Sequence, residues 1–315
     1  MFQPTQKLAI GKAHGKLILV GEHSVVYGMP AIALPFPMVE VISTVKEIPE
    51  TVMIECDYYS GPLSTIPKKM DGISACIFET LKMLNKPAKD FMIQLSSTIP
   101  LGRGLGSSAA VAVAIVKSLY AFFGERLDRK KLMSLVHIAE THAHGNPSGV
   151  DMYSTASDVP IWFQKEREIK TIRIGAPLHL VVADSGRIGD THSAVSSVRE
   201  NYQLHKADTE ASLNRLMRIT FDARTAISDG NTKLLGDLLN LAHDELVTLG
   251  VSDEGLDQLV RSAQQSGALG SKLTGGGRGG CVLALAESSI HAKQLADQFM
   301  ESGASQTWNF TLEVI

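Results

Sequence analysis

Apolar residues in the first part of the chain alternate with small or polar ones, which is the period of β-strands. The alternation runs through residues 31–45 and 52–56, where Pro35 and Pro37 restrict pairing to edges or bends. Shorter apolar segments predict further strands. We expect these at residues 7–10, 16–20 and 91–96, with a turn over Gly11–Gly15 between the first two.

Helical spacing of apolar residues appears three times before residue 145. Residues 71–85 place isoleucines and leucines on one helical face. A second helix is expected after Ser107, a good N-cap, and it runs through alanines and valines to Gly124. Residues 127–143 predict a third helix, with apolar residues on one side and lysines on the other.

The second half of the chain is mostly helical. A hairpin over residues 161–174 and a strand over 179–183 precede the helices. Helices are predicted at 191–206, 209–228, 231–248, 253–266 and 289–302, and strands at 282–285 and 307–314. Helices on one face of a mainly antiparallel sheet are typical of an α+β fold. The 315 residues suit two domains, 1–174 and 175–315, although no Pro-rich or Gly/Ser-rich linker marks the boundary.

Composition narrows the possible partners. A net charge of −3 provides no basic field that would attract nucleic acid or an anionic membrane. Cys56, Cys76 and Cys281 are odd in number and widely spaced, which indicates neither disulfides nor zinc and implies a reducing compartment. The first ten residues lack a signal peptide's apolar segment, and no apolar run approaches the roughly 20 residues of a membrane span. We therefore expect a soluble, cytoplasmic protein without nucleic-acid or membrane partners.

The segment Pro100–Ala110 carries three glycines at alternate positions and leads into a predicted helix. Glycine adds no side chain to a core, so its use here is close approach of the backbone to something else. The free N–H groups and the positive end of the helix dipole suit a phosphate. The segment lacks the Gly-Lys-Ser/Thr of a Walker A loop and matches the dinucleotide fingerprint poorly. A flexible loop with a helix cap is the alternative.

Polar residues also follow the predicted strand over 16–20. Lys16 stands between a glycine and four apolar residues, where its charge must reach water or meet an anion. Glu22 and His23 come at the end of that strand, a common place for function, although surface turn chemistry explains them equally well.

Two further loops carry candidate chemistry. Residues 144–151 describe a tight loop, in which Pro147 and Ser148 could open a helix with Asp151 about one turn in. Gly270–Cys281 is a second glycine-rich loop, placed before the predicted strand over 282–285.

In this order, the segments Gly15–His23, Pro100–Ala110 and Lys272–Cys281 resemble the motifs of the GHMP kinase superfamily. The octet His144–Asp151 resembles the second motif of the mevalonate kinases within that superfamily. The resemblance implies an N-terminal domain like domain 2 of ribosomal protein S5, a ferredoxin-like C-terminal domain and an active site in the cleft between them. It also implies transfer of the γ-phosphoryl group of ATP to the 5-hydroxyl of (R)-mevalonate, with Mg²⁺, in isoprenoid biosynthesis.

The resemblance assigns roles to individual residues. Asp151 matches the aspartate that accepts or orients the proton of the substrate hydroxyl, and Lys16 matches the lysine that offsets developing negative charge. Ser108 and Glu140 match the Mg²⁺ ligands, and a hydroxyl with a carboxylate suits a hard cation. The substrate-binding residues implied are Lys16, Glu22, His23 and Asp151. The nucleotide-binding residues implied are Gly102, Arg103, Gly104, Leu105, Gly106, Ser107, Ser108, Thr274, Gly275 and Gly276.

The chain departs from the superfamily pattern in three places. His14 replaces the usual proline before Gly15, and Arg103 and Arg278 stand among residues that are commonly small. We favour a solvent-facing position for each, with added charge near the phosphates as the alternative.

Two other functions remain open on the sequence. One is another small-molecule kinase of the superfamily, such as phosphomevalonate kinase; the octet ending in Asp151 favours mevalonate. The other is a non-catalytic nucleotide or metabolite sensor, which the complete set of four catalytic and metal residues disfavours. The resemblance further implies a homodimer and, as in many members, inhibition by isoprenoid diphosphates.

Overall fold

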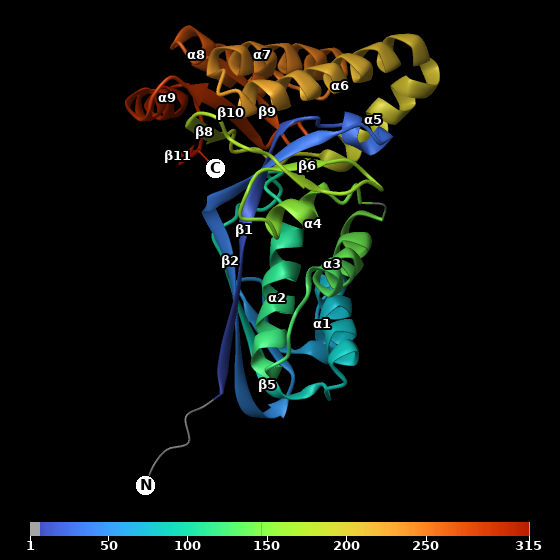
Figure 1. The fold of residues 1–315 in the computed structure, drawn as a ribbon. Helices are drawn as coiled ribbons and strands as arrows, with labels where there is room; N and C mark the ends of the chain where they lie inside the picture. Colours follow the sequence, from blue (N-terminus) through green and yellow to red (C-terminus); the bar gives the residue numbers. More distant parts are fainter. Residues whose placement is uncertain (1–6, 146, 315) are drawn as a thin grey trace. The chain divides into compact units, whose positions relative to one another are not determined.

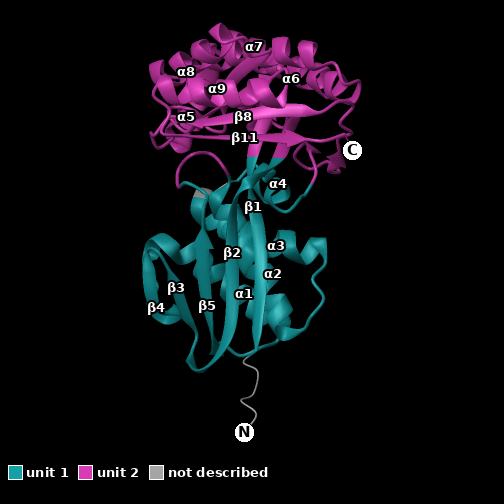
Figure 2. Ribbon diagram, turned by 90° about the vertical axis from the view of Figure 1, so that its left-hand side faces the viewer, with its two compact units in different colours: residues 1–16, 35–100, 106–158 teal, residues 17–34, 101–105, 159–315 magenta. Residues whose placement is uncertain are grey.

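The computed structural model describes residues 7–145 and 147–314 (Figure 1). The chain forms two compact units, which Figure 2 colours separately. Unit 1 comprises Met1–Lys16, Pro35–Pro100 and Gly106–Asp158, and unit 2 comprises Leu17–Leu34, Leu101–Leu105 and Val159–Ile315. Helices pack on β-strands in each unit, so the predicted α+β class is confirmed. The division follows packing and does not test the domain boundary near residue 174, which stays a prediction.

The strands that lie wholly or mostly in unit 1 pair in the order β4, β3, β5 and β2, and β1 also pairs with β2. These strands are β1 (Leu8–Val20), β2 (Ala31–Thr51), β3 (Met53–Cys56), β4 (Tyr59–Pro62) and β5 (Lys89–Ser97). β3 pairs parallel with β5, and β2 pairs antiparallel with β5 from Val41 onward. The two prolines of β2 precede this pairing, because proline has no backbone N–H to donate to a neighbouring strand.

The predicted turn over Gly11–Gly15 is wrong, because β1 continues through it as one strand. Gly11 lies so close to α2 that a Cβ atom there would collide with the backbone of Ala114 and Ser118. The glycine therefore lets the strand approach the helix, which the sequence does not distinguish from a turn.

Helices α1 and α2 cover one face of the unit 1 sheet, behind the strands in Figure 2, and α3 packs on α1 and α2. The helical segments are η2 (Leu63–Thr65), η3 (Lys68–Met70), α1 (Asp71–Leu84), α2 (Ser107–Phe123), α3 (Arg129–His144) and α4 (Val150–Thr155). The apolar faces of α1 and α2 meet the sheet in a core that includes Ile54, Ile77, Phe91 and Ile115. The three long predicted helices are thus confirmed.

Unit 2 contains an antiparallel sheet in the order β11, β8, β10 and β9. These strands are β8 (Leu178–Asp184), β9 (Gly270–Thr274), β10 (Cys281–Ala286) and β11 (Gln306–Leu312). β9 was not predicted, because its Ser271, Lys272 and Thr274 are polar yet buried. The predicted hairpin is formed by β6 (Ile161–Phe163) and β7 (Lys170–Thr171), and β6 pairs with the first residues of β2.

The predicted helices of unit 2 are confirmed. They are α5 (Thr191–Leu204), α6 (Lys206–Ser228), α7 (Thr232–Thr248), α8 (Glu254–Gln265) and α9 (Ser289–Glu301). The short η1 (Ser24–Tyr27) was not predicted. Helices α7, α8 and α9 pack on the sheet of β8 to β11, and α6 packs on α7 (Figure 1). The three cysteines are free thiols. Among the described residues, none of the helices combines the length and apolar character that crossing a membrane requires.

The close approach at Gly11 predicts a stability cost for any side chain there. We expect Gly11→Ala to lower the free energy of unfolding by about 1–3 kcal/mol, because strand or helix must shift to admit the methyl group. Urea unfolding measures the change, with Lys12→Ala on the exposed side of the same strand as control. Equal stability of the two variants would contradict the packing described for β1.

Candidate active site

A buried lysine and a partly exposed aspartate meet in unit 1. Lys16 lies on β1 and Asp151 lies in the first turn of α4, and their Nζ and Oδ1 atoms are 2.9 Å apart. The side chain of Lys16 is 3% exposed and that of Asp151 is 30% exposed. The ammonium group thus has its anion away from water, while the carboxylate keeps a side that a reactant can approach.

The end of the first glycine loop lies against this pair. Gly106 has a φ of 78°, and a Cβ atom there would stand 2.8 Å from Cγ of Lys16 and 3.1 Å from Cγ2 of Thr155. Gly106 is also the N-cap of α2, so the prediction of Ser107 as N-cap is wrong and Ser107 is the first helical residue. The chain enters α2 through a left-handed turn that glycine adopts readily. Three segments distant in sequence therefore converge at Lys16.

The loop of the octet leads directly into α4. Gly149, with a φ of 93°, is the N-cap, and Asp151 is the second helical residue, earlier in the helix than the predicted position about one turn in. Pro147 and Ser148 precede the helix rather than opening it, and Asn146 of the octet lies outside the described residues.

Ser108 and Glu140 lie on two helices of unit 1 that pack against each other. Ser108 is exposed in the first turn of α2, and Glu140 is buried near the end of α3. Among the residues described, no group of three or more His, Cys, Asp and Glu side chains is arranged to hold a metal ion. The donor chemistry of one hydroxyl and one carboxylate nevertheless fits Mg²⁺, which retains waters and binds phosphate oxygens.

In unit 2 the two glycine loops touch each other. A Cβ atom on Gly104 would stand 3.3 Å from Cα of Gly275, and one on Gly275 would stand 3.1 Å from Cα of Gly104. The predicted nucleotide-binding residues Gly104 and Gly275 are therefore neighbours. Their backbones come close because neither loop has a side chain at the contact.

Arg103 does not face solvent, which corrects the favoured prediction. Its Nε atom lies 2.7 Å from Oδ1 of Asp184, and the two side chains are 14% and 5% exposed. Asp184 also accepts a hydrogen bond of 2.8 Å from the Gly186 N–H. This pair connects the first glycine loop to the end of β8, and Asp184 was missed because it reads as the ordinary polar end of an apolar strand.

Arg278 also has defined partners rather than a free, solvent-facing side chain. Its guanidinium donates hydrogen bonds of 2.9 Å to the hydroxyls of Ser193 and Ser197 on α5 and one of 3.1 Å to the Gly250 carbonyl. Arg278 therefore connects the second glycine loop to α5 and to the residues that follow α7.

His14 is half-buried in unit 1 and turned toward Asp158. The distance between Nε2 of His14 and Oδ1 of Asp158 is 3.7 Å, and Nδ1 lies 2.6 Å from the carbonyl of Gly15. A shallow hollow of about 330 Å³ lies beside it, lined partly by Lys12, His14, Lys117 and Asp158.

Glu22 and His23 are both buried in unit 2. The His23 ring lies 2.9 Å from the carbonyl of Gly276 through Nε2. Burial lowers the pKa of His23 from 6.5 to about 4, and the nearby charges of Lys272 and Arg278 act in the same direction. The ring is therefore neutral at pH 7, with its Nε2–H donated to Gly276 and Nδ1 as the acceptor.

Lys272 is the residue of this region that sequence reasoning missed. Its ammonium donates to the carboxylate of Glu22, and both side chains are fully buried. Its position at the start of the motif Lys272–Cys281 could have indicated a role, but a single lysine before a run of glycines is usually a surface residue. The solvent-facing interpretation of Glu22 as turn chemistry is excluded by the same pair.

Two family models match the chain, and together they span both of its halves. The description GHMP kinases N terminal domain matches residues 73–158, and GHMP kinases C terminal matches residues 223–305. The mevalonate kinase of Thermococcus sibiricus is 33% identical over 297 residues, covering 88% of this chain and 89% of the relative.

Solved structures of mevalonate kinases share the fold. The enzyme from methicillin-resistant Staphylococcus aureus MRSA252 is 29% identical, with a TM-score of 0.72 over 98% of this chain and 99% of the other. The L. major enzyme in complex with R-mevalonate has a TM-score of 0.86 over 100% and 99% of the two chains. Its 24% identity supports the fold alone. The predicted two-domain GHMP kinase fold is confirmed by these matches.

The neutral, buried state of His23 predicts a pH-dependent stability. Because its pKa is lower in the folded chain, the unfolded chain takes up the proton first as the pH falls. The contribution, about 3 kcal/mol for a shift from 6.5 to about 4, is complete above pH 6.5 and is lost progressively toward pH 4.

Urea unfolding at pH 7 and pH 4.5 measures this loss in the wild type and in His23→Asn. Asparagine keeps a polar side chain at this position and removes the titrating ring. We expect the wild type to lose more stability than the variant. An identical pH dependence of the two proteins would show that His23 is not buried in its neutral form.

Proposed function

The chain belongs to the mevalonate kinases of the GHMP kinase family, and from this premise we propose that it transfers the γ-phosphoryl group of ATP to the 5-hydroxyl of (R)-mevalonate. The product is 5-phosphomevalonate. The observation that carries the proposal is the contact of 2.9 Å between Lys16 and Asp151 at the end of a glycine loop.

Asp151 and Lys16 divide the chemistry of the transfer. A primary alcohol is a poor nucleophile, so a carboxylate within hydrogen-bond reach helps by orienting the hydroxyl or accepting its proton. The exposed side of Asp151 suits this role. The ammonium of Lys16 is held beside that carboxylate, where it offsets the negative charge that develops between nucleophile and phosphoryl group.

Ser108 and Glu140 are the residues proposed to hold Mg²⁺. The ion, when bound, neutralises charge on the phosphate oxygens and on the leaving group. The exposed hydroxyl of Ser108 and the buried carboxylate of Glu140 support the assignment by their chemistry and by lying on two helices in contact.

The glycine loops are proposed to bind the phosphates of ATP. Backbone N–H groups from Gly102 to Ser108 and from Thr274 to Gly276 supply donors that need no side chain. Arg103 supports this role indirectly, since its charge is neutralised by Asp184 and holds the loop in place. We propose this structural role for the side chain of Arg103, while its predicted contact with nucleotide is made through its backbone N–H.

On the substrate side, His23 is proposed to contact mevalonate, whereas Glu22, fully buried against Lys272, is proposed to act by positioning. With Nε2–H donated to Gly276, the neutral ring of His23 offers Nδ1 as an acceptor. An acceptor suits a hydroxyl hydrogen of mevalonate better than its carboxylate, because two acceptors cannot share a hydrogen bond.

The proposal extends to the setting of the enzyme. It places the reaction in the cytoplasm, in isoprenoid biosynthesis, on a homodimer subject to inhibition by isoprenoid diphosphates. The family resemblance is the support for each of these, and sedimentation velocity tests the dimer.

Asp151→Asn is expected to lower kcat by about 10²–10⁴-fold, because the amide is a much weaker acceptor for the hydroxyl proton. Binding of ATP, measured by calorimetry, should be nearly unchanged. Asp158→Asn makes the same substitution at an almost fully exposed position of the same unit and serves as the control. Near wild-type turnover of Asp151→Asn would remove Asp151 from the mechanism.

The choice of acceptor is tested by ADP production from Mg-ATP with (R)-mevalonate, phosphomevalonate, homoserine and no acceptor. We expect turnover with mevalonate, because the octet and the relatives match mevalonate kinases. Turnover of phosphomevalonate alone would assign the chain to the other kinase. Clear ATP binding with no turnover of any acceptor would instead favour a sensor.

A further inference from the structure

The turn formed by Glu22, His23 and Ser24 has an uncommon backbone conformation. His23 has φ of 60° and ψ of −48°, and the Ser24 N–H donates a hydrogen bond of 2.6 Å to the carbonyl of Glu22. This is a γ-turn of the rare, positive-φ kind, which is strained for a residue with a side chain. Such a conformation persists only where the surrounding structure holds it.

Strand β9 and the loop that follows it hold this part of unit 2. Residues two apart on a strand face the same side, so Lys272 and Thr274 point together toward the segment 18–23. The contacts in this row are Lys272 with Glu22, Thr274 with Ile18, and Gly276 with His23. The γ-turn is thus held by the side chains of both Glu22 and His23, which contact Lys272 and Gly276.

Of these contacts, the ion pair of Lys272 and Glu22 is the costly one to build. Both side chains are fully buried, and the ammonium also donates a hydrogen bond of 2.6 Å to the carbonyl of Leu273. Burial lowers the pKa of Lys272, an effect that the carboxylate of Glu22 opposes. A buried pair of this kind adds little net stability, so its value lies in the geometry that it imposes.

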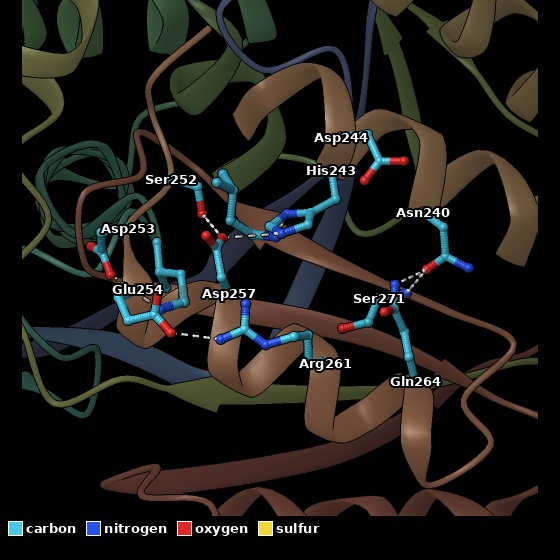
Figure 3. Close-up of polar contacts among 12 residues, drawn as sticks. Asn240, His243, Asp244, Ser252, Asp253, Glu254, Asp257, Arg261, Gln264 and Ser271 are labelled. Atoms are coloured by element: carbon cyan, nitrogen blue, oxygen red, sulfur yellow. Dashed lines mark hydrogen bonds and ion pairs between the residues drawn. The ribbon is translucent and has the colours of Figure 1, made fainter. Parts of the chain in front are cut away.

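The backbone that carries Lys272 is fixed from the other side by two helices. His243 on α7 accepts a hydrogen bond of 3.4 Å from the Leu273 N–H through Nδ1. Its Nε2 lies 3.3 Å from Asp257 on α8, and this aspartate accepts a hydrogen bond of 2.5 Å from the Ser252 hydroxyl (Figure 3). Lys272 therefore projects from an anchored strand.

We propose that Lys272 is a positioning residue for phosphoryl transfer, which through the carboxylate of Glu22 holds the γ-turn that presents His23 to mevalonate. The inference rests on the proposed function. Lys272 has no exposed atom with which to touch the substrate, so it acts through Glu22 and His23.

The test uses Lys272→Met, the double variant Lys272→Met with Glu22→Gln, and Lys293→Met on the exposed side of α9 as control. The single variant leaves a buried carboxylate without its lysine and is expected to be less stable. The double variant removes both charges and is expected to recover stability, although the γ-turn still lacks the ion pair that holds it. Urea unfolding reports the stability of each protein.

We expect KM for mevalonate to rise at least about tenfold in the single and double variants, because a small displacement of a binding group is costly. KM for ATP should stay within about twofold of the wild type and of Lys293→Met. Recovery of the mevalonate KM together with stability in the double variant would show a merely structural pair and overturn the proposal.

The ¹⁵N chemical shifts of histidine give a second readout that needs no activity. In the wild type they should show the proton of His23 on Nε2, and in both Lys272 variants this preference should weaken as the bond to Gly276 is lost. An unchanged tautomer with unchanged KM overturns the positioning role. If the wild type does not phosphorylate mevalonate, the proposed function fails, and the tautomer still decides whether Lys272 holds the turn.

Discussion

Pairing of a buried cation with one carboxylate is the interaction on which the arrangement of the candidate site depends. Three pairs follow this scheme: Lys16 with Asp151, Arg103 with Asp184, and Lys272 with Glu22. Withdrawing each ion from water costs several kcal/mol, so a partner must be supplied with good geometry. Since the partners are far apart in sequence, each pair fixes a loop or turn against a distant element of its own unit.

The three pairs differ in exposure, and this difference separates their roles. Asp151 keeps 30% of its side chain exposed, so a reactant can reach it, whereas Glu22 and Asp184 are almost completely covered. A covered carboxylate cannot exchange a proton with a substrate hydroxyl, but it can hold a neighbouring residue in place. The same kind of interaction is therefore proposed to supply chemistry in one unit and geometry in the other.

The arginines that depart from the superfamily pattern illustrate how such geometry is hidden in a sequence. Arg103 and Arg278 stand in glycine-rich loops, where a long charged side chain is most simply placed in water. In the structure each extends away from its loop to a specific partner, Asp184 for one and the serines of α5 for the other.

The sequence by itself determined the class of fold, the long helices and the segments that carry the site. Helical and strand periods report local burial, and motifs such as Pro100–Ala110 keep their order along the chain whatever the packing. Tertiary structure alone decided that Gly11 lies within a strand, that β9 is a strand of buried polar residues, and that Lys272 pairs with Glu22. These outcomes depend on contacts between distant residues, which no local period encodes.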